Sequence, residues 1–526
     1  MRAGCGVVTR SKGEGMTPPE AERFGLKLTR PLLAVVAVSS LLFFFALGSS
    51  RTLTYHEALL AGSAKQMVAD GRWLVLYIGD IPRLEKPPLP QWIVAAWAML
   101  LGEFTEGTVR APFAVFGVLV IVLEMLLMTR LFDARTGLWC GLIQATCVYQ
   151  ITYARLAESD IILQALVLAA VLLFVWREWG DASWTARQHF AVRLGFWTLL
   201  GVMNLLKGVG FGAILTVLTC GGWLILRGDA RGLKRWWSWT GAALAAVIGL
   251  AWPLAVTLYE PGGLSVWNDQ ILGRATGSLG RYQPIWYYAL QWPVQLLPWT
   301  PFLFVSAAAS WKRARTEPQS ADRLLWWWAL SHPALLTLSS GKHHHYLIYA
   351  LPALTPLMVQ GLFQTGNALA RRLAALQTPS VMRLAGAFAF AVVIIGHLTV
   401  QAVVMPRRDP SAADTQFIAD VEKQVPATET LTALGGQDVA RHVFYLHRPI
   451  EGFSQSEKLV PLLHTASPVF VIARGTYEDE LRKLGDVSAI LQSRMTRRET
   501  SASDRYTLFR LTKREGLAES AERHLE

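Results

Sequence analysis

Residues 160–176 of the chain read DIILQALVLAAVLLFVW, a run whose one charged side chain is its first residue, Asp160. A helix of this length and composition can cross the hydrocarbon core of a bilayer, which is roughly 30 Å thick. Apolar runs of 17 or more residues recur from Pro31 to about Val404. Of the 526 residues, 52% are apolar and only 17% are charged, too few charges to cover a soluble protein of this length. The sequence therefore predicts an all-α polytopic membrane domain.

We expect about eleven spans and one short helix on the membrane surface. Residues 88–102, PLPQWIVAAWAMLLG, are short and begin with prolines, a pattern typical of an interfacial helix. The predicted spans are 31–49, 111–130, 136–153, 160–176, 191–206, 208–226, 236–258, 289–311, 324–340, 345–364 and 383–405.

The basic residues predict the orientation of these spans. If residues 88–102 do not cross, five basic clusters fall on the same side as the basic N-terminal tail, and the positive-inside rule assigns that side to the cytoplasm. The net charge of +12 is then explained by loops retained at the membrane, and no nucleic-acid partner is expected. The clusters are Arg130/Arg135, Arg177/Arg187/Arg193, Arg227/Arg231/Lys234/Arg235, Lys312/Arg313/Arg315/Arg323 and Arg371/Arg372/Arg383.

We expect an integral protein of a bacterial inner or plasma membrane, and we expect its chain to have three parts. They are a cytoplasmic basic tail (1–30), a membrane domain (31–405) whose outer loop 50–110 carries interfacial helices, and an extracytoplasmic segment (406–526). The first apolar run lacks an obvious small-residue cleavage site, so we interpret it as a retained signal anchor.

The C-terminal segment differs from the rest in its pattern. Short strand-like runs alternate there with helical patterns, which predicts a small α/β domain outside the membrane. The runs are Thr430–Leu434, Val443–Leu446, Val469–Ala473 and Tyr506–Leu511. The four cysteines (Cys5, Cys140, Cys147 and Cys220) have no metal-type spacing, and none lies in this segment, so no disulfide framework is expected to stabilise it.

Ionisable side chains at span ends on the predicted outer side are candidates for one shared site, because charge near a bilayer is costly without a role or a partner. The candidates are His56, Glu57, Glu85 and Lys86 in the first outer loop, Arg155, Glu158 and Asp160 in the second, and Lys207, Arg274, Lys342 and His344 in later loops.

Carboxylates and cations together suit a polyprenyl-phosphate sugar donor. The lipid tail needs an apolar groove open to the bilayer, and fixed Lys or Arg side chains can stabilise the phosphate that leaves. A carboxylate can take the proton of an attacking hydroxyl group. Such a reaction requires no nucleotide, which suits an outer compartment.

Five short motifs follow one another along the chain. Residues 56–92, HEALLAGSAKQMVADGRWLVLYIGDIPRLEKPPLPQW, are followed by TYARLAESDIIL (152–163), LLKGVG (205–210), WYYALQWPVQLLPWTPFL (286–303) and GKHHHYLIYALPAL (341–354). Together they resemble the outer-loop motifs of GT-C glycosyltransferases related to aminoarabinose transferases and protein O-mannosyltransferases. Each motif is weak alone, and their order makes the resemblance strong.

The resemblance implies an inverting transferase that uses a polyprenyl-phosphate-linked sugar, such as an undecaprenyl-phosphate sugar, and a lipid, glycan or protein acceptor, as in lipid A modification or protein glycosylation. By position, Glu57 and Asp160 would be the catalytic carboxylates. His56 stands where many members have Asp, so it would assist Glu57 as the base.

The same resemblance implies that Lys86 contacts the donor phosphate. Arg155, Lys207, Lys342 and Arg274 are further candidates for phosphate contacts. No cofactor is required by this chemistry, although some relatives hold a divalent metal near the Glu that precedes the lysine. By analogy, Glu85 with His344 would hold such an ion here.

Each candidate also has a structural interpretation. Glu57 can cap the following helix or pair with Arg51, and Asp160 is favoured at a helix N-terminus on dipole grounds alone. Lys86 before two prolines can mark a turn at the membrane surface, and Lys207 and Lys342 can extend from span ends to water. Glu158 can simply pair with Arg155.

Two other functions compete with transfer. A lipid flippase or solute transporter should show inverted repeats and ionisable groups near the middle of the membrane, whereas here the charges lie at one face and no repeat is visible. A membrane scaffold that displays the outer domain is the second rival. Loss of sugar transfer on replacing Glu57 or Asp160 would favour the enzyme.

Overall fold

The computed structural model describes residues 18–180, 184–208, 210–260, 262, 265–266, 283–338, 342–466, 468–494 and 504–513. The chain divides into two compact units. We call Met1–Leu47, Glu85–Leu89 and Ala111–Val400 the helical unit, and Gly48–Leu84, Pro90–Arg110 and Gln401–Glu526 the sheet unit. The expected division differs, since it placed the whole outer loop 50–110 with the membrane domain.

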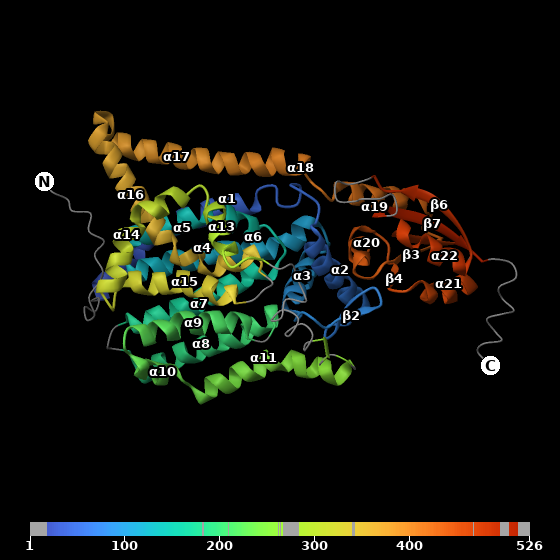
Figure 1. The fold of residues 1–526 in the computed structure, drawn as a ribbon, viewed down its shortest axis with the longest axis horizontal. Coiled ribbons are helices and arrows are strands. Elements are labelled where there is room, and N and C mark those ends of the chain that lie inside the picture. Colours follow the sequence, from blue (N-terminus) through green and yellow to red (C-terminus); the bar gives the residue numbers. More distant parts are fainter. Residues whose placement is uncertain are drawn as a thin grey trace. The chain divides into compact units, whose positions relative to one another are not determined.

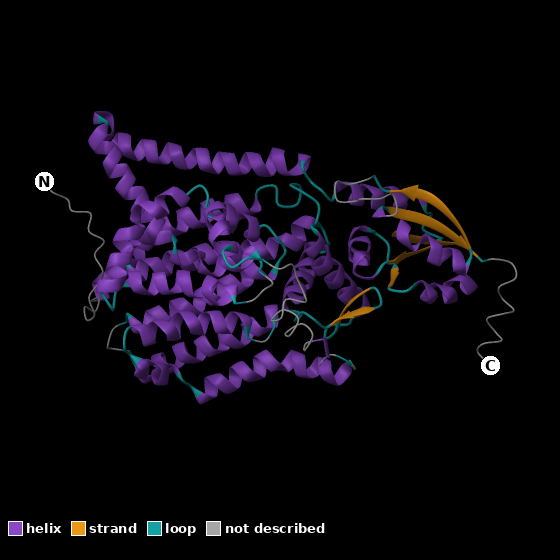
Figure 2. Ribbon diagram, in the orientation of Figure 1, coloured by secondary structure: helices purple, strands orange, loops and turns teal. Residues whose placement is uncertain are grey.

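Within its described residues, the helical unit consists of helices and the loops that join them (Figure 2). Its helices are α1 (Pro18–Phe44), α4 (Glu106–Leu131, which begins in the sheet unit), α5 (Ala134–Ala145), α6 (Val148–Ala154), α7 (Ser159–Glu178), α8 (Ala186–Lys207), α9 (Phe211–Leu226), α10 (Ala230–Trp236), α11 (Trp239–Tyr259), α13 (Tyr287–Gln295), α14 (Thr300–Thr316), α15 (Ala321–Thr337), η1 (His344–Ala353), α16 (Thr355–Arg372), η2 (Ala374–Gln377) and α17 (Pro379–Thr399). A π-helical turn (Val400–Val404) follows α17 and leads to the short helix α18 (Met405–Arg407).

Five described helices are long and apolar enough to cross a membrane, or six if a bent pair counts as one span. They are α4, α7, α8, α11 and the segment Pro379–Arg407, and the bent pair is η1 with α16, which meet at 63°. Shorter apolar helices lie at Thr29–Phe44, α3 (Leu89–Leu101) and α9. The structure thus bears out a helical membrane protein with several apolar helices, and the count of eleven spans stays a prediction.

Several predicted spans are interrupted rather than continuous. The expected span 136–153 breaks between α5 and α6, where Val148 N donates to the carbonyl of Leu297 and the Trp299 indole donates to Thr146 Oγ1. Such partners are needed because an unpaired backbone group is costly within a bilayer. The expected span 289–311 is likewise divided into α13 and α14.

Contacts within the helical unit gather the basic clusters at one end, which we call the basic end. Glu178 at the end of α7 accepts from Arg227 after α9 and from the Trp236 indole in α10. Arg323 at the start of α15 donates to the carbonyl of Leu226, the last residue of α9. Loops far apart in sequence therefore lie together, as the charge pattern predicted.

The opposite end of the helical unit contains Asp160, and we call it the Asp160 end. Helices α7, α8 and α9 pack beside one another (Figure 1). The 20 residues of α7 extend about 30 Å at 1.5 Å per residue, which matches the thickness of a hydrocarbon core. Charged groups at both ends and apolar side chains between them suit a membrane span.

The sheet unit contains the described strands. Its first-loop elements are α2 (Tyr55–Asp70), β1 (Leu76–Ile78), β2 (Ile81–Arg83) and most of α3. The C-terminal elements are α19 (Ala412–Gln424), β3 (Thr430–Leu434), η4 (Gly436–Asp438), α20 (Val439–Tyr445), β4 (Glu451–Phe453), η5 (Ser456–Leu459), α21 (Val460–Thr465), β5 (Val469–Arg474), η6 (Gly475–Tyr477), α22 (Glu478–Leu484), β6 (Asp486–Gln492) and β7 (Tyr506–Thr512).

The five-stranded sheet has the order β4-β3-β5-β7-β6. Strand β3 is parallel to β4 and β5, whereas β7 is antiparallel to β5 and β6. Three predicted strand runs are strands, but Val443–Leu446 was wrong, because most of this run lies in helix α20. Four apolar residues cannot distinguish a buried helix face from a strand, and here α20 packs against α2.

One hydrophobic core joins the first loop to the C-terminal elements. Leu59 of α2 and Ile78 of β1 are buried in the same cluster as Val421, Leu431 and Ile472. A Cβ atom on Gly62 would lie 2.4 Å from the carbonyl oxygen of Ala440, so α2 and α20 approach too closely there for any side chain. This core is why most of the loop belongs to the sheet unit.

Candidate functional site

Asp160 forms the centre of a buried polar cluster at the Asp160 end. It lies in the first turn of α7, where its charge suits the helix dipole. Lys207 Nζ, from the last residue of α8, lies 2.5 Å from Asp160 Oδ1. The Tyr349 hydroxyl of η1 donates to the same oxygen at 2.7 Å. The structure thus brings two predicted site residues into direct contact and adds a third.

Aromatic rings surround the Lys207 ammonium group. Its Nζ lies 4.6 Å from the centre of the Tyr346 ring and 5.5 Å from that of Phe211. The Tyr346 ring in turn meets His345 edge-on at 4.5 Å. A cation held against ring faces and a single carboxylate oxygen is fixed in place rather than mobile, as a phosphate-binding group should be.

His344, at the start of η1, contacts two tyrosines of α6. The Tyr153 hydroxyl lies 3.0 Å from His344 Nε2, and the Tyr149 hydroxyl donates to the His344 carbonyl. Tyr149 and Tyr153 meet edge-on at 5.2 Å. The histidine run therefore packs on α6, next to the start of α7.

Arg155 has a structural role at the end of α1. Its guanidinium group is buried and donates to the backbone carbonyls of Leu42, Phe43, Phe45 and Ala46 at 2.7 to 3.2 Å. These carbonyls end helix α1, and Ala46 adopts a positive φ of 51° as the chain turns. An arginine here completes the hydrogen bonds of a helix C-terminus, and its contact with a phosphate stays a prediction.

Glu57 is buried in the sheet unit. Its Oε2 atom accepts from the Thr54 backbone N–H at 2.9 Å, and Thr54 Oγ1 accepts from the Glu57 N–H, which makes a capping box for α2. Arg110 donates to both carboxylate oxygens, at 2.7 and 3.1 Å. Burial, the largest single effect, would raise the pKa of Glu57, but the charges of Arg110 and Arg51 and the hydrogen bonds from Arg110 and Thr54 together outweigh it, so the pKa is lowered. This geometry favours the capping interpretation.

The other predicted residues lie in varied settings. His56, next to Glu57, is exposed on the first turn of α2, and Lys86 is also exposed. Lys342 is buried and donates to the carbonyl of Gln283 at 2.9 Å. Arg274 lies outside the described residues.

The structure offers no support for the predicted metal site. Within the described part of the chain, no three His, Cys, Asp or Glu side chains form a group that could hold a metal ion. The pair Glu85 and His344 belongs to no such group, and no step of the chemistry below depends on a metal.

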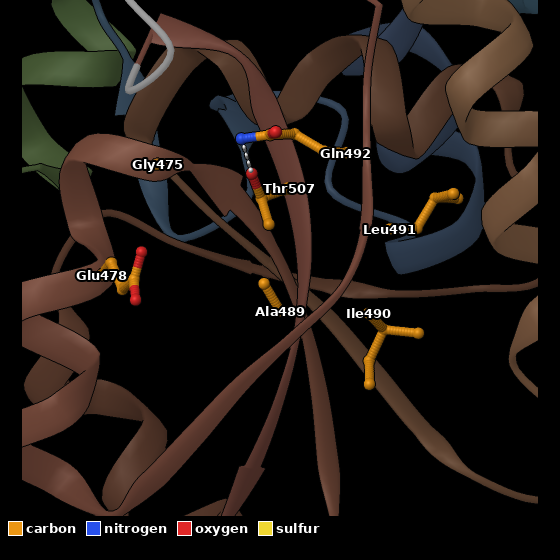
Figure 3. Close-up of a pocket in the computed structure, with 7 residues that line it drawn as sticks. All are labelled: Gly475, Glu478, Ala489, Ile490, Leu491, Gln492 and Thr507. Atoms are coloured by element: carbon orange, nitrogen blue, oxygen red, sulfur yellow. Dashed lines mark hydrogen bonds between the residues drawn. The ribbon is translucent and has the colours of Figure 1, made fainter.

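A pocket in the sheet unit contains none of the predicted site residues. It lies beside β6 and β7, lined by Gly475, Glu478, Ala489, Ile490, Leu491, Gln492 and Thr507. Figure 3 shows the Gln492 amide directed at Thr507 Oγ1, 3.3 Å away. Its lining has one carboxylate and no cation, so it does not suit a phosphate.

The sequence prediction missed Tyr349 and Arg110. Tyr349 lies within the quoted run 341–354, yet its neighbours in sequence give no sign that it reaches Asp160. Arg110 stands at an expected span boundary, 53 residues from Glu57. A contact over this sequence separation depends on the tertiary fold and leaves no local pattern in the sequence.

Comparison with known proteins agrees with the resemblance seen in the motifs. A model of the family described as dolichyl-phosphate-mannose-protein mannosyltransferase matches residues 85–253. An undecaprenyl phosphate-alpha-4-amino-4-deoxy-L-arabinose arabinosyl transferase from Pseudomonas aeruginosa is 29% identical over 336 residues, 60% of this chain and 57% of that protein. The one from Shewanella sediminis is 27% identical, over 61% of this chain and 57% of the relative. The chain thus matches somewhat more than half the length of these relatives.

Solved structures show the fold. The crystal structure of ArnT from Cupriavidus metallidurans bound to undecaprenyl phosphate gives a TM-score of 0.74 at 17% identity, covering 91% of this chain and 98% of that one. The apo oligosaccharyltransferase of Archaeoglobus fulgidus gives 0.53 at 13% identity, covering 85% and 70%. The described chain therefore has an ArnT-like fold.

Proposed function

We propose, since the chain resembles GT-C glycosyltransferases of the aminoarabinose transferase kind in both sequence and fold, that it transfers a sugar from a polyprenyl-phosphate donor to an acceptor. The observation that carries this proposal is the buried contact of Asp160 with Lys207 and Tyr349 at one end of an apolar helical unit. The acceptor is a lipid, a glycan or a protein.

The bond changes define what the site must do. The acceptor oxygen forms a bond to the anomeric carbon as the bond from that carbon to the phosphate oxygen breaks, and the bonding electrons leave with the phosphate. Lys207 supplies positive charge for that phosphate. Asp160 and Tyr349 act as positioning residues, because they fix the ammonium group before the donor arrives.

The acceptor determines whether a base is required. A phosphate acceptor is already an anion, whereas a hydroxyl acceptor must lose a proton. Of the two residues predicted for this task, His56 is exposed and Glu57 is fully engaged with Thr54 and Arg110. The exposed imidazole of His56 is the more available base of the two.

The orientation belongs to the same proposal. We place the Asp160 end and residues 406–526 outside and the basic end in the cytoplasm, with eleven spans between. Single cysteines at Arg371 and His447, in a chain whose own cysteines are replaced, would report the two sides. Labelling of both positions by one impermeant reagent in intact cells would contradict this arrangement.

The decisive experiment uses the full chain in liposomes with a labelled undecaprenyl-phosphate sugar. The first donor to test carries 4-amino-4-deoxy-L-arabinose, as named for the relatives. We expect Asp160→Asn to lower transfer about 100-fold or more, because a preorganised charge is lost. Retained transfer in this variant, or no transfer by the parent with aminoarabinose and mannose donors, would remove the proposal.

Asp322→Asn is the matched control. Asp322 is also buried at a helix start, with Arg313 Nε 2.8 Å from Oδ2 and the Ser310 hydroxyl on Oδ1, but it lies at the basic end. Removing its charge perturbs folding in a similar way to Asp160→Asn. Transfer per folded molecule should remain within a few-fold of the parent, which separates chemistry from stability.

A further inference from the structure

The helical unit has an open apolar groove that sugar transfer does not use. The groove holds about 800 Å³ and lies between α9, α14 and α15. Most of its lining is leucine, alanine and tryptophan, and four of these large side chains are exposed: Leu226, Trp311, Leu330 and Leu338. The volume of this groove lies within the range of roughly 300–1,000 Å³ that is typical of ligand sites.

The groove has fixed walls. The Trp327 indole donates to the carbonyl of Leu218 at 2.7 Å. Gly222 of α9 makes room for this ring, since a Cβ atom there would lie 2.4 Å from the indole. Trp326 donates to Ser310 Oγ at 3.0 Å and meets Trp311 edge-on at 5.2 Å. Packed rings of this kind keep the groove open rather than collapsed.

Positive charge is confined to one end of the groove. Arg315 and Arg323 line it, whereas its lining contains no carboxylate. The Arg323 guanidinium group donates hydrogen bonds to the backbone carbonyls of Ala314, Leu226 and Arg315. The side chain of Arg315 is exposed. Both lie at the basic end, the end opposite the Asp160 cluster.

The apolar part extends away from this charge along α15. From Arg323 to Leu338 the helix rises about 22 Å, more than the ~15 Å of half a hydrocarbon core. The acyl chains of one lipid therefore fit beside α15 with the headgroup at the arginines. Basic sites between membrane helices on the cytoplasmic side suit anionic lipid headgroups.

We propose that this groove binds an anionic phospholipid of the leaflet at the basic end, with the phosphate at Arg315 and Arg323 and an acyl chain against Trp326, Trp327 and Leu330. This lipid is distinct from the sugar donor, whose phosphate belongs at the Asp160 end. Its chemistry follows from the charge and apolar length of the groove alone, so it does not depend on sugar transfer.

The test is native mass spectrometry of the full chain in detergent, titrated with phosphatidylglycerol and with phosphatidylcholine and without any sugar donor. We expect phosphatidylglycerol to bind more tightly. Arg315→Gln should weaken phosphatidylglycerol binding about five-fold, because it removes one unit of positive charge near the headgroup. Arg315→Glu changes the charge by two units and should weaken binding about 25-fold. Ala334→Trp, which fills the groove, should abolish it.

Two variants serve as controls. Arg371→Gln removes another arginine at the basic end, from the end of α16, which does not line the groove. Ala385→Trp adds the same ring to the exposed face of α17. Both should bind phosphatidylglycerol like the parent.

Three outcomes would overturn the proposal. Equal binding of the two phospholipids by the parent would show that no anion is recognised. Unchanged binding in Ala334→Trp would show that the headgroup binds without the groove. The third outcome is that equimolar undecaprenyl phosphate displaces phosphatidylglycerol and that Arg315→Glu does not change this displacement. The groove would then bind the lipid tail of the donor instead. None of these outcomes bears on Asp160 and transfer.

Discussion

Glu57 and Arg110, 53 residues apart, are joined by two hydrogen bonds of 2.7 and 3.1 Å and are almost completely buried. The guanidinium group also donates to the carbonyls of Arg51 and Thr52 at 2.9 Å. One arginine thus ties the start of α2 to the turn before it. A carboxylate so placed stabilises the loop, and its lowered pKa makes it a weak base.

The pair predicts a characteristic result in a double-mutant cycle. Glu57→Gln alone should cost about 3 kcal/mol, because it leaves a buried guanidinium group without its counter-charge. Adding Arg110→Leu should recover part of this loss, which thermal unfolding in detergent would measure. Transfer by folded Glu57→Gln should fall less than ten-fold. A normal melting temperature with transfer lowered 1000-fold would return Glu57 to the catalytic role.

Tyr349→Phe tests whether Asp160 needs both of its partners. The substitution removes one hydrogen bond to a charged group and keeps the ring, so we expect transfer to fall about ten-fold. Thermal stability should change little. Transfer assays at saturating donor and acceptor would measure the effect, and a rate equal to that of the parent would show that the hydroxyl does not position Asp160.

Arg155→Gln should lower stability and leave donor affinity unchanged. Its guanidinium group serves four carbonyls at the end of α1, and their loss should cost about 2 to 3 kcal/mol. The melting temperature and the KM for the donor would separate the two effects. A raised KM with an unchanged melting temperature would restore Arg155 as a phosphate contact.

His442 predicts that the sheet unit loses stability in mild acid. Burial, followed by the charge of Arg441, lowers its pKa to about 3, with Arg474 acting in the same direction and Asp438 against it. An unfolded histidine has a pKa near 6.5, so the unfolded state binds the extra proton between these values. The stabilisation that comes from the neutral, buried His442 is therefore fully present above pH ~6.5. It is lost as the pH falls below that value, by about 1.4 kcal/mol per pH unit at most.

The check is the melting temperature of the parent and of His442→Leu at pH 7.5 and pH 5. The leucine variant has no proton to gain and should show a smaller difference between the two pH values. His447 is an exposed histidine of the same unit. His447→Gln should keep most of the parent's pH dependence, and equal slopes for the parent and His442→Leu would refute the assignment.

Local pattern alone determined the class of the protein and the grouping of its loops. Apolar length predicted a helical membrane protein, and the positions of the basic residues predicted that Arg177, Arg227–Arg235 and Arg323 lie at one end, because both signals add up residue by residue along the chain. Asp160 and Lys207 were recognisable as candidates for the same reason, since each stands where an apolar run meets a polar loop.

The partners of buried polar groups were decided only by the tertiary structure. Arg155 could have bound a phosphate as readily as the carbonyls of Leu42 to Ala46, and Glu57 could have faced solvent rather than Arg110. The sharing of one core by Leu59 and Ile472 was equally invisible in the sequence. These contacts join residues dozens to hundreds of positions apart, and a buried charge takes whichever partner the packing of helices brings within hydrogen-bonding distance.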